Sequence, residues 1–367
     1  MARLLFLVAL VASIDLIFFA KDVPPVRQGP IMTLTSSAIS FWREGRFNTP
    51  LFESVKEELE KRTKEKQVIY AQDVFAVTAK GTLAPKHCAV LIPLAAIFYG
   101  LFGLWGFTVL NGLFLIFIAI SLYRLTKSIV KGEPFLTIVT ILMLGTQTLF
   151  ILYELSYDLF GACLIICGLD MARKKPLGGA FLMAFSLFVR PFNIVYMPFL
   201  IYIALLMAEN KDRKYTLLSL FSGFALGCGI FGMYNHLLWG SPFVTVYDRT
   251  PNFAKGEMVF KPAISLFSIK VFLSDWWAKL FGLKSGLLLY NPALLALPFI
   301  AFRGFWNFCK VEKSLFFGGL MPALLLFGYK YWGSTGFGNR FLLPSIYLWC
   351  VLIVSWAYKK GYLRATR

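Results

Sequence analysis

The sequence has few of the residues that carry most soluble-protein chemistry. It holds two histidines and 19 acidic residues in 367 positions, and only 15% of its residues are charged. The six cysteines are scattered, mostly within apolar stretches, and none pairs with another at a Cys-x-x-Cys spacing. We therefore expect neither a disulfide framework nor a cysteine metal site.

Apolar residues are abundant instead. Hydrophobic residues make up 58% of the chain, aromatic residues 17%, and the mean hydropathy is +0.68. This exceeds what a soluble core of this size can hide, so we predict a single polytopic membrane domain over 1–367. The net charge of +18 lies in short basic clusters between apolar runs. That pattern is typical of membrane topology and argues against a nucleic-acid partner.

The apolar runs predict an all-α protein with about ten transmembrane helices, because about 20 apolar residues span a bilayer core. The expected spans are 3–20, 104–123, 134–152, 156–171, 177–190, 192–208, 215–236, 285–303, 314–330 and 341–358. The first run follows Arg3 and continues to Phe19 without a nearby small-x-small cleavage site. We interpret it as an anchor rather than a signal peptide.

Basic clusters occupy every second connection, from Arg124 and Lys127 through Arg173 to Lys359 and Lys360. The positive-inside rule makes these connections cytoplasmic, so both termini are expected inside the cytoplasmic (inner) membrane. Two long outer loops then cover 21–103 and 237–284. The first contains "IMTLTSSAISFWREG", typical of an interfacial helix, and an apolar stretch from Cys88 to Gly103 that predicts a re-entrant or interfacial helix.

Ionisable residues near membrane depth are costly unless they are paired or face water. Asp15 lies inside the first expected span, where it either pairs with a basic neighbour or serves a site. Glu154 and Asp158 share a helical face; they either hold a divalent metal, orient a hydroxyl, or are solvated loop acids. Arg190, before Pro191, either grips a phosphate or snorkels.

Further candidates lie in the expected outer loops. Lys86 and His87 are adjacent and precede an apolar run. Tyr247, Asp248 and Arg249 lie in the stretch "YNHLLWGSPFVTVYDRTP", and Arg340 follows a glycine-rich stretch. Nearly all charged residues without a topological explanation thus gather on the predicted outer side.

Six stretches in order resemble one superfamily. "GTLAPKHCAVLIPLAAIFYGLFG", "ELSYDLFGACLIICGL", "FVRPFN", "YNHLLWGSPFVTVYD", "GLLLYNPALLALP" and "YWGSTGFGNRFLLP" are similar to prokaryotic multi-pass proteins of the glycosyltransferase C superfamily, relatives of aminoarabinose and protein O-mannosyl transferases. The resemblance implies an inverting transferase. Such an enzyme moves a sugar from a polyprenyl-phosphate donor to a lipid, glycan or protein acceptor on the outer face.

The physical requirements of such a donor assign roles to the candidates. Its phosphate needs cations, and the candidates are Lys86, Arg190, Arg249 and Arg340. His87 then orients the phosphate or serves the acceptor, and Tyr247 and Asp248 complete the expected substrate-binding set. A divalent metal at Glu154 and Asp158 is expected only if the reaction depends on metal.

The sequence departs from the superfamily at the expected catalytic base. Members commonly carry an acid shortly before the interfacial helix, but no carboxylate lies near Gly29 and Pro30. Asp22, Asp15, Glu44 and Asp158 are the substitutes, and Asp158 is the residue we predict. A lipid-linked-sugar transporter and a catalytically inactive membrane subunit stay open as alternatives, although no internal repeat of the transporter type is found.

Overall fold

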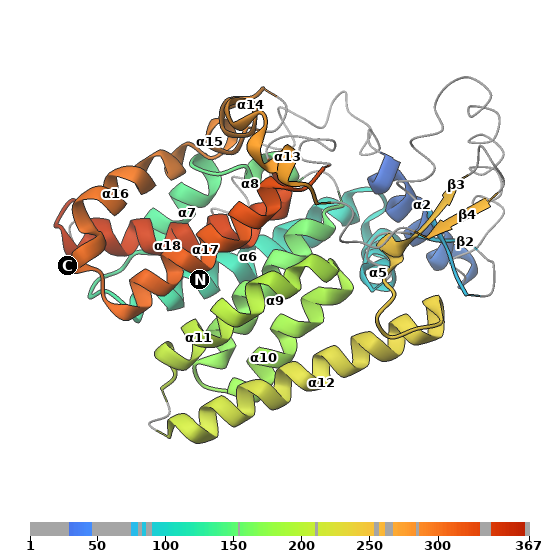
Figure 1. Ribbon diagram of the computed structural model, residues 1–367, viewed down its shortest axis with the longest axis horizontal. Helices are drawn as coiled ribbons and strands as arrows, with labels where there is room; N and C mark the ends of the chain where they lie inside the picture. Colours follow the sequence, from blue (N-terminus) through green and yellow to red (C-terminus); the bar gives the residue numbers. More distant parts are fainter. Residues whose placement is uncertain are drawn as a thin grey trace.

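The protein is a bundle of helices in the computed structural model (Figure 1). The structure describes residues 29–45, 75–79, 83–85, 90–152, 155–209, 212–252, 257–260, 267–283, 286–330 and 339–363. This confirms the helical fold. Two short antiparallel ribbons, not expected from the sequence, join β1 (Phe75–Val77) to β2 (Leu83–Pro85) and β3 (Arg249–Asn252) to β4 (Glu257–Phe260).

The helices follow one another along most of the described chain. They are α2 (Gly29–Glu44), α5 (Leu91–Phe102), α6 (Trp105–Lys127), α7 (Phe135–Leu144), α8 (Thr148–Ile151), α9 (Tyr157–Ala172), α10 (Pro176–Phe185), η1 (Ser186–Phe188), η2 (Pro191–Tyr196), α11 (Met197–Met207), α12 (Arg213–Trp239), η3 (Val246–Asp248), α13 (Ile269–Leu273), α14 (Trp276–Phe281), α15 (Leu287–Tyr290), η5 (Pro292–Leu295), α16 (Ala296–Gly304), η6 (Phe305–Asn307), α17 (Lys310–Phe327), η7 (Arg340–Leu342) and α18 (Leu343–Lys359).

Three helices in the described ranges are long and apolar enough to cross a membrane: α6, α12, and η7 with α18. They coincide with three of the expected spans. Of the other expected spans in the described ranges, 314–330 overlaps α17, which is 18 residues long but includes Lys310, Glu312 and Lys313, and the rest contain shorter or interrupted helices. The count of about ten is therefore not confirmed. The run 3–20 lies outside the described residues.

Glycine and proline residues explain where helices end within the expected spans. α7 ends at Gly145, where an added Cβ would lie 2.9 Å from Ala293 Cβ. Pro191 follows Arg190 and begins η2, and Pro292 begins η5 after Asn291. A proline cannot donate the backbone hydrogen bond that a continuing helix needs, so a new helix begins there.

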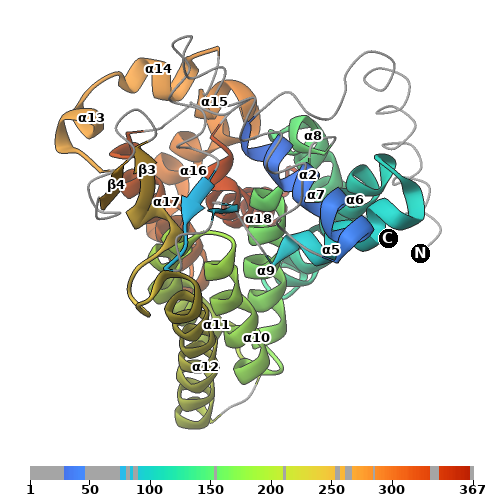
Figure 2. The ribbon, with the colours of Figure 1, turned by 90° about the vertical axis from the view of Figure 1, so that its right-hand side faces the viewer.

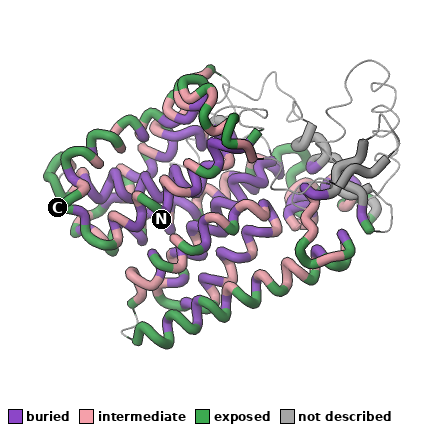
Figure 3. The backbone as a smooth tube through the Cα atoms, viewed as in Figure 1, coloured by how far each residue is buried: buried purple, intermediate pink, exposed green. Residues whose placement is uncertain are grey.

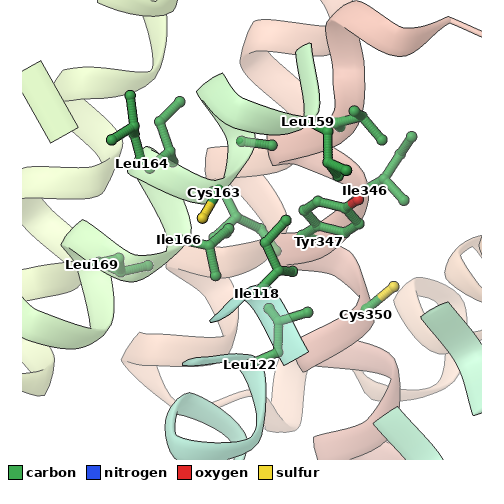
Figure 4. Close-up of a cluster of buried hydrophobic side chains, with 14 of the residues drawn as sticks. Ile118, Leu122, Leu159, Cys163, Leu164, Ile166, Leu169, Ile346, Tyr347 and Cys350 are labelled. Carbon is green, nitrogen blue, oxygen red and sulfur yellow. The ribbon is translucent and has the colours of Figure 1, made fainter. Parts of the chain in front are cut away.

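The helices differ in how far they are covered (Figure 3). In the most apolar 18 residues of each helix, 83% are buried in the α18 segment but only 28% in α12. Side chains of α6, α9 and α18 form the centre of the core, including Ile118, Leu159, Ile166, Ile346 and Tyr347 (Figure 4). Thus α18 is the central helix and α12 is peripheral.

Small residues allow the peripheral helix to pack closely. Gly223 and Gly227 stand four apart on α12 and face α10, where an added Cβ would lie 2.1 Å from Leu177 O and 2.5 Å from Ala184 Cβ. Such spacing brings helix backbones together in the absence of a hydrophobic driving force between helices in lipid.

The expected interfacial helices are present as helices. α2 begins at Gly29 and packs against α5, with the Trp42 ring over Gly100, whose added Cβ would lie 2.3 Å from Trp42 Cζ2. α5 occupies most of the predicted 88–103 stretch. α2 also contacts β2, whereas β3 and β4 lie well apart from α5 (Figure 2).

Several basic clusters gather at one end of the bundle, which we call the basic end. Arg124 at the end of α6 pairs with Asp170 near the end of α9 at 3.4 Å. Lys359 at the end of α18 pairs with Glu312 at the start of α17 at 3.0 Å, and Tyr358 Oη donates to Glu133 O at 3.1 Å. This agrees with the pattern from which the topology was predicted. Which membrane and which side this end faces stay predictions.

Candidate functional site

Three predicted site residues meet at the opposite end, which we call the site end. Asp158 lies in the first turn of α9, which Ser156 caps by accepting a hydrogen bond from Leu159 N at 3.1 Å. Arg190 occupies the extended residue between η1 and η2, and Arg340 begins η7. Residues far apart in the sequence therefore converge where helices begin.

The two arginines share one carboxylate. Arg190 Nε donates a hydrogen bond to Asp158 Oδ1, and Arg340 Nε lies 3.1 Å from Asp158 Oδ2. The second contact is an ion pair without hydrogen-bond geometry, since Oδ2 and Arg340 Nε have no hydrogen-bond partner among the described residues. Asp158 is therefore the counter-ion of both guanidinium groups.

A tyrosine joins the same cluster. Arg190 Nη2 donates to Tyr157 Oη at 3.2 Å, and Arg340 Nη2 donates to it at 3.5 Å. The Arg190 guanidinium also lies 4.1 Å from the centre of the Phe341 ring. Aromatic faces attract cations, so these rings hold the arginines in place.

The cluster is buried and carries surplus positive charge. The exposed fractions of the side chains are 2% for Asp158, 7% for Arg190 and 9% for Arg340. Two guanidinium charges and one carboxylate leave one net positive charge among the described residues. The N-terminal ends of α9, of η2 with α11, and of η7 with α18 add partial positive charge. The arrangement is suited to a bound anion.

An aromatic wall covers the cluster. Phe192 lies 5.4 Å from Tyr247 and 5.7 Å from Tyr329, and Tyr329 lies 5.4 Å from Phe341, between ring centres. Burial raises the pKa of Tyr247, against the opposing effect of Arg190, so the phenol stays neutral and does not cancel the guanidinium charge.

Asp248, in the second predicted outer loop, stabilises a turn of its own loop. Asp248 Oδ2 accepts hydrogen bonds from Thr245 N at 2.7 Å and Thr245 Oγ1 at 2.8 Å, which closes the turn that precedes β3. Asp248 and Tyr247 are both buried. Arg249 begins β3, and its side chain lies outside the described residues.

Sequence reasoning missed an amide network beside the cluster. Gln147 Nε2 donates to Asn339 O at 3.0 Å, and Gln147 N donates to Asn291 Oδ1 at 2.9 Å. Asn339 Oδ1 accepts from Phe341 N at 3.1 Å, while its buried Nδ2 has no partner among the described residues. The hydrogen bonds of Gln147 thus connect the helix breaks after Gly145 and at Asn291 to Asn339, the residue before Arg340. Polar residues at Gly- or Pro-marked breaks, in "GTQT" and "YNP", were the available signal.

Several predicted residues lie outside the described part of the chain: Asp15, Asp22, Lys86, His87 and Glu154. Their roles stay predictions. The described residues contain no group of three or more histidine, cysteine or acidic side chains placed to hold a metal. Two guanidinium groups flank Asp158, which favours an anion beside it. The predicted metal pair with Glu154 stays a prediction, because Glu154 is not among the described residues.

Comparison of the chain with protein-family models, with curated proteins and with solved structures gives no match. The superfamily resemblance of the six motifs therefore stays a prediction, and the buried cluster is the basis for a function.

Proposed function

We propose that the protein binds a lipid-linked phosphate at Arg190 and Arg340 and transfers the sugar of a polyprenyl-phosphate donor to an acceptor. The observation that supports this most is the buried arginine pair with a single shared carboxylate. A guanidinium group matches the oxygens of a phosphate with two parallel hydrogen bonds. The departing polyprenyl phosphate would be stabilised by the same charges.

Asp158 has two tasks in this proposal. As counter-ion, it keeps two guanidinium groups close together in a buried place before the donor binds. As base, it needs an acceptor hydroxyl within about 2.6–3.2 Å, and Oδ2, which accepts no hydrogen bond among the described residues, is the oxygen for that contact. Arg340 then moves from Oδ2 to the donor phosphate.

The test is transfer of radiolabelled sugar from polyprenyl-phosphate sugars by purified protein in lipid. Arg340→Gln removes one site guanidinium, and we expect transfer to fall at least tenfold. Arg124→Gln removes an arginine that contacts an aspartate at the basic end, and we expect it to keep wild-type transfer. Equal transfer by the two variants would contradict the proposed site.

A second candidate, a transporter of the same lipids, is favoured by the broken helices. Breaks at Gly145, at Arg190 and at Asn291 lie beside or within the cluster and its amide network. Helix breaks next to a ligand are typical of secondary transporters. Proteoliposomes separate the two functions: a transporter moves the labelled donor across the bilayer without consuming it, whereas a transferase releases polyprenyl phosphate.

A further inference from the structure

The segment from Phe267 to Leu283 forms a helical hairpin on the flank of the bundle. α13 and α14 are joined at Ser274 and Asp275, and Asp275 has a positive φ of 54°. The hairpin is attached to the end of α17, where Ser268 N donates to Gly328 O at 2.9 Å. Figures 1 and 2 both place it at the periphery, next to α15.

The inner face of the hairpin packs on the bundle. The Trp276 ring lies 4.8 Å from that of Phe327 and 5.4 Å from that of Phe272, between centres. Leu280 also packs against the core. The apolar residues on this face are therefore explained by the protein itself.

The outer face is apolar as well. It is formed by Ile269, Leu273, Trp277, Phe281 and Leu283, which are all exposed. Trp277 is 76% exposed, and its ring lies 4.5 Å from that of Phe281. Single exposed apolar residues are normal, but a contiguous set of large ones marks an interaction surface.

The basic residue of α14 is turned away from this outer face. Lys279 is buried, and its Nζ donates to Ser274 O at 2.8 Å and to Val271 O. It satisfies carbonyl groups at the end of α13, which have no partner within that short helix. Lys270 and Asp275 are the exposed charged residues of the hairpin, and they lie in its first turn and at its bend.

We propose that this outer face lies in the bilayer, at the boundary between headgroups and acyl chains. The sequence alone places this segment in the second long outer loop, 237–284. α14 packs beside α15, and exposed large apolar residues also occur along α15, η5, α16 and η6, namely Leu289, Leu295, Phe299, Phe302 and Trp306. A tryptophan on such a face, with a lysine at its margin, is typical of a membrane interface.

The location connects the lipid surface to the cluster. Phe267, directly before the hairpin, lies 5.2 Å from Phe192 and 5.5 Å from Tyr329 in the aromatic wall, between ring centres. The ring contacts continue from Tyr329 to Phe341, which lies against Arg190, so a chain of aromatic side chains connects the base of the hairpin to the arginine cluster. The inference about the hairpin does not depend on the proposed transferase activity.

The test is quenching of tryptophan fluorescence in vesicles of phosphatidylcholine brominated near the ester end of the acyl chains. The protein is compared with Trp277→Phe, which removes the indole and keeps an aromatic ring. Trp349→Phe, in the buried core, is the matched control. We expect the fluorescence that is lost in Trp277→Phe to be the part that brominated lipid quenches in the wild type. The fluorescence that is lost in Trp349→Phe should be a part that brominated lipid does not quench.

Quenching by iodide, which stays in the water, shows whether the Trp277 side chain lies in water or against protein instead of in lipid. If the signal lost in Trp277→Phe is quenched by iodide and not by brominated lipid, the face lies in water and the proposal is overturned. If neither quencher reaches that signal, a protein surface such as a second copy of the chain covers the face, and the proposal is overturned as well.

Discussion

Helix α9 carries an aspartate near each end, and each aspartate contacts two arginines. At the site end, Asp158 contacts Arg190 and Arg340. At the basic end, Asp170 lies 3.4 Å from Nη1 of both Arg124 and Arg173. The residue types are the same, so the difference in surroundings shows what each cluster can do.

The two clusters differ in burial and in charge balance. Arg124 is 63% exposed, and Arg173 has a second partner in Glu209 at 3.1 Å. There two cations face two anions; Arg124 and Glu209 contact water, whereas Asp170 and Arg173 are only 10% and 13% exposed. At the site end two buried cations face one anion among the described residues. A partly exposed cluster with balanced charge fixes helix ends and gains little from a ligand, whereas a buried surplus charge favours binding of an anion.

The largest expected difference concerns the loss of each aspartate. Asp158→Ala leaves two guanidinium groups buried without a counter-ion, and we expect it to lower the free energy of unfolding by about 3–5 kcal/mol. Asp170→Ala leaves Arg124 largely in water and Arg173 still paired with Glu209, so we expect a smaller loss of about 1 kcal/mol. Unfolding in detergent, followed by circular dichroism, measures both.

The expected difference between Asp158→Ala and Asp170→Ala can be contradicted by the same unfolding measurements. Equal losses for the two variants would mean that the guanidinium groups at the site end are hydrated or otherwise compensated. A double variant, Asp158→Ala with Arg340→Gln, should recover part of the stability, because one of the uncompensated charges is removed with its partner.

The next largest effect concerns phosphate binding. If Arg340 contributes a charge-assisted hydrogen bond of about 1.5–3 kcal/mol, Arg340→Gln should weaken binding of polyprenyl phosphate roughly tenfold to a hundredfold. Arg124→Gln should leave the dissociation constant unchanged. Binding by fluorescence titration in detergent micelles measures both, and an unchanged affinity in Arg340→Gln would refute the phosphate role.

A smaller effect tests the surplus charge itself. Asn339→Asp keeps the oxygen that accepts from Phe341 N and replaces the unpartnered Nδ2 by a second carboxylate oxygen on the residue before Arg340. The added anion would balance the cluster, as Glu209 helps to do at the basic end. We expect polyprenyl phosphate to bind about tenfold more weakly, or about 1.4 kcal/mol, with the fold retained. Unchanged or tighter binding would show that charge balance does not control the site.

Much of the helical arrangement was accessible from the sequence, because apolar runs and basic clusters act locally. The runs around α6, α12 and α18 are long and uninterrupted, and these helices were predicted close to their observed bounds. The interrupted runs were harder: whether Gly145 ends a helix depends on Ala293, which is distant in the sequence and approaches it closely.

The candidate site was predicted in part for a similar reason. Charged residues in apolar surroundings are conspicuous, so Asp158, Arg190 and Arg340 were selected and expected on the same, outer side of the membrane. That two arginines contact one carboxylate depends on how α9, η2 and η7 meet, which no local pattern encodes. The amides Gln147 and Asn339 carry no charge and were overlooked, although their hydrogen bonds hold the residue before Arg340.

The smallest effect is expected in an exposed ion pair of the basic end. Glu133 accepts hydrogen bonds from Lys127 Nζ and from Tyr123 Oη, the latter at 2.7 Å, and the bond from Lys127 is the main cause that lowers the pKa of Glu133. A lowered folded-state pKa means that the stabilisation is present above the unfolded-state pKa and is lost as the pH falls through the folded-state value. Both side chains are about half exposed, so solvent and salt screen the pair. We expect Glu133→Gln to unfold within error of the wild type at neutral pH, and any difference to vanish in acid. If its melting temperature instead fell as far as that of Asp158→Ala, the buried cluster at the site end would contribute no more to stability than an exposed ion pair.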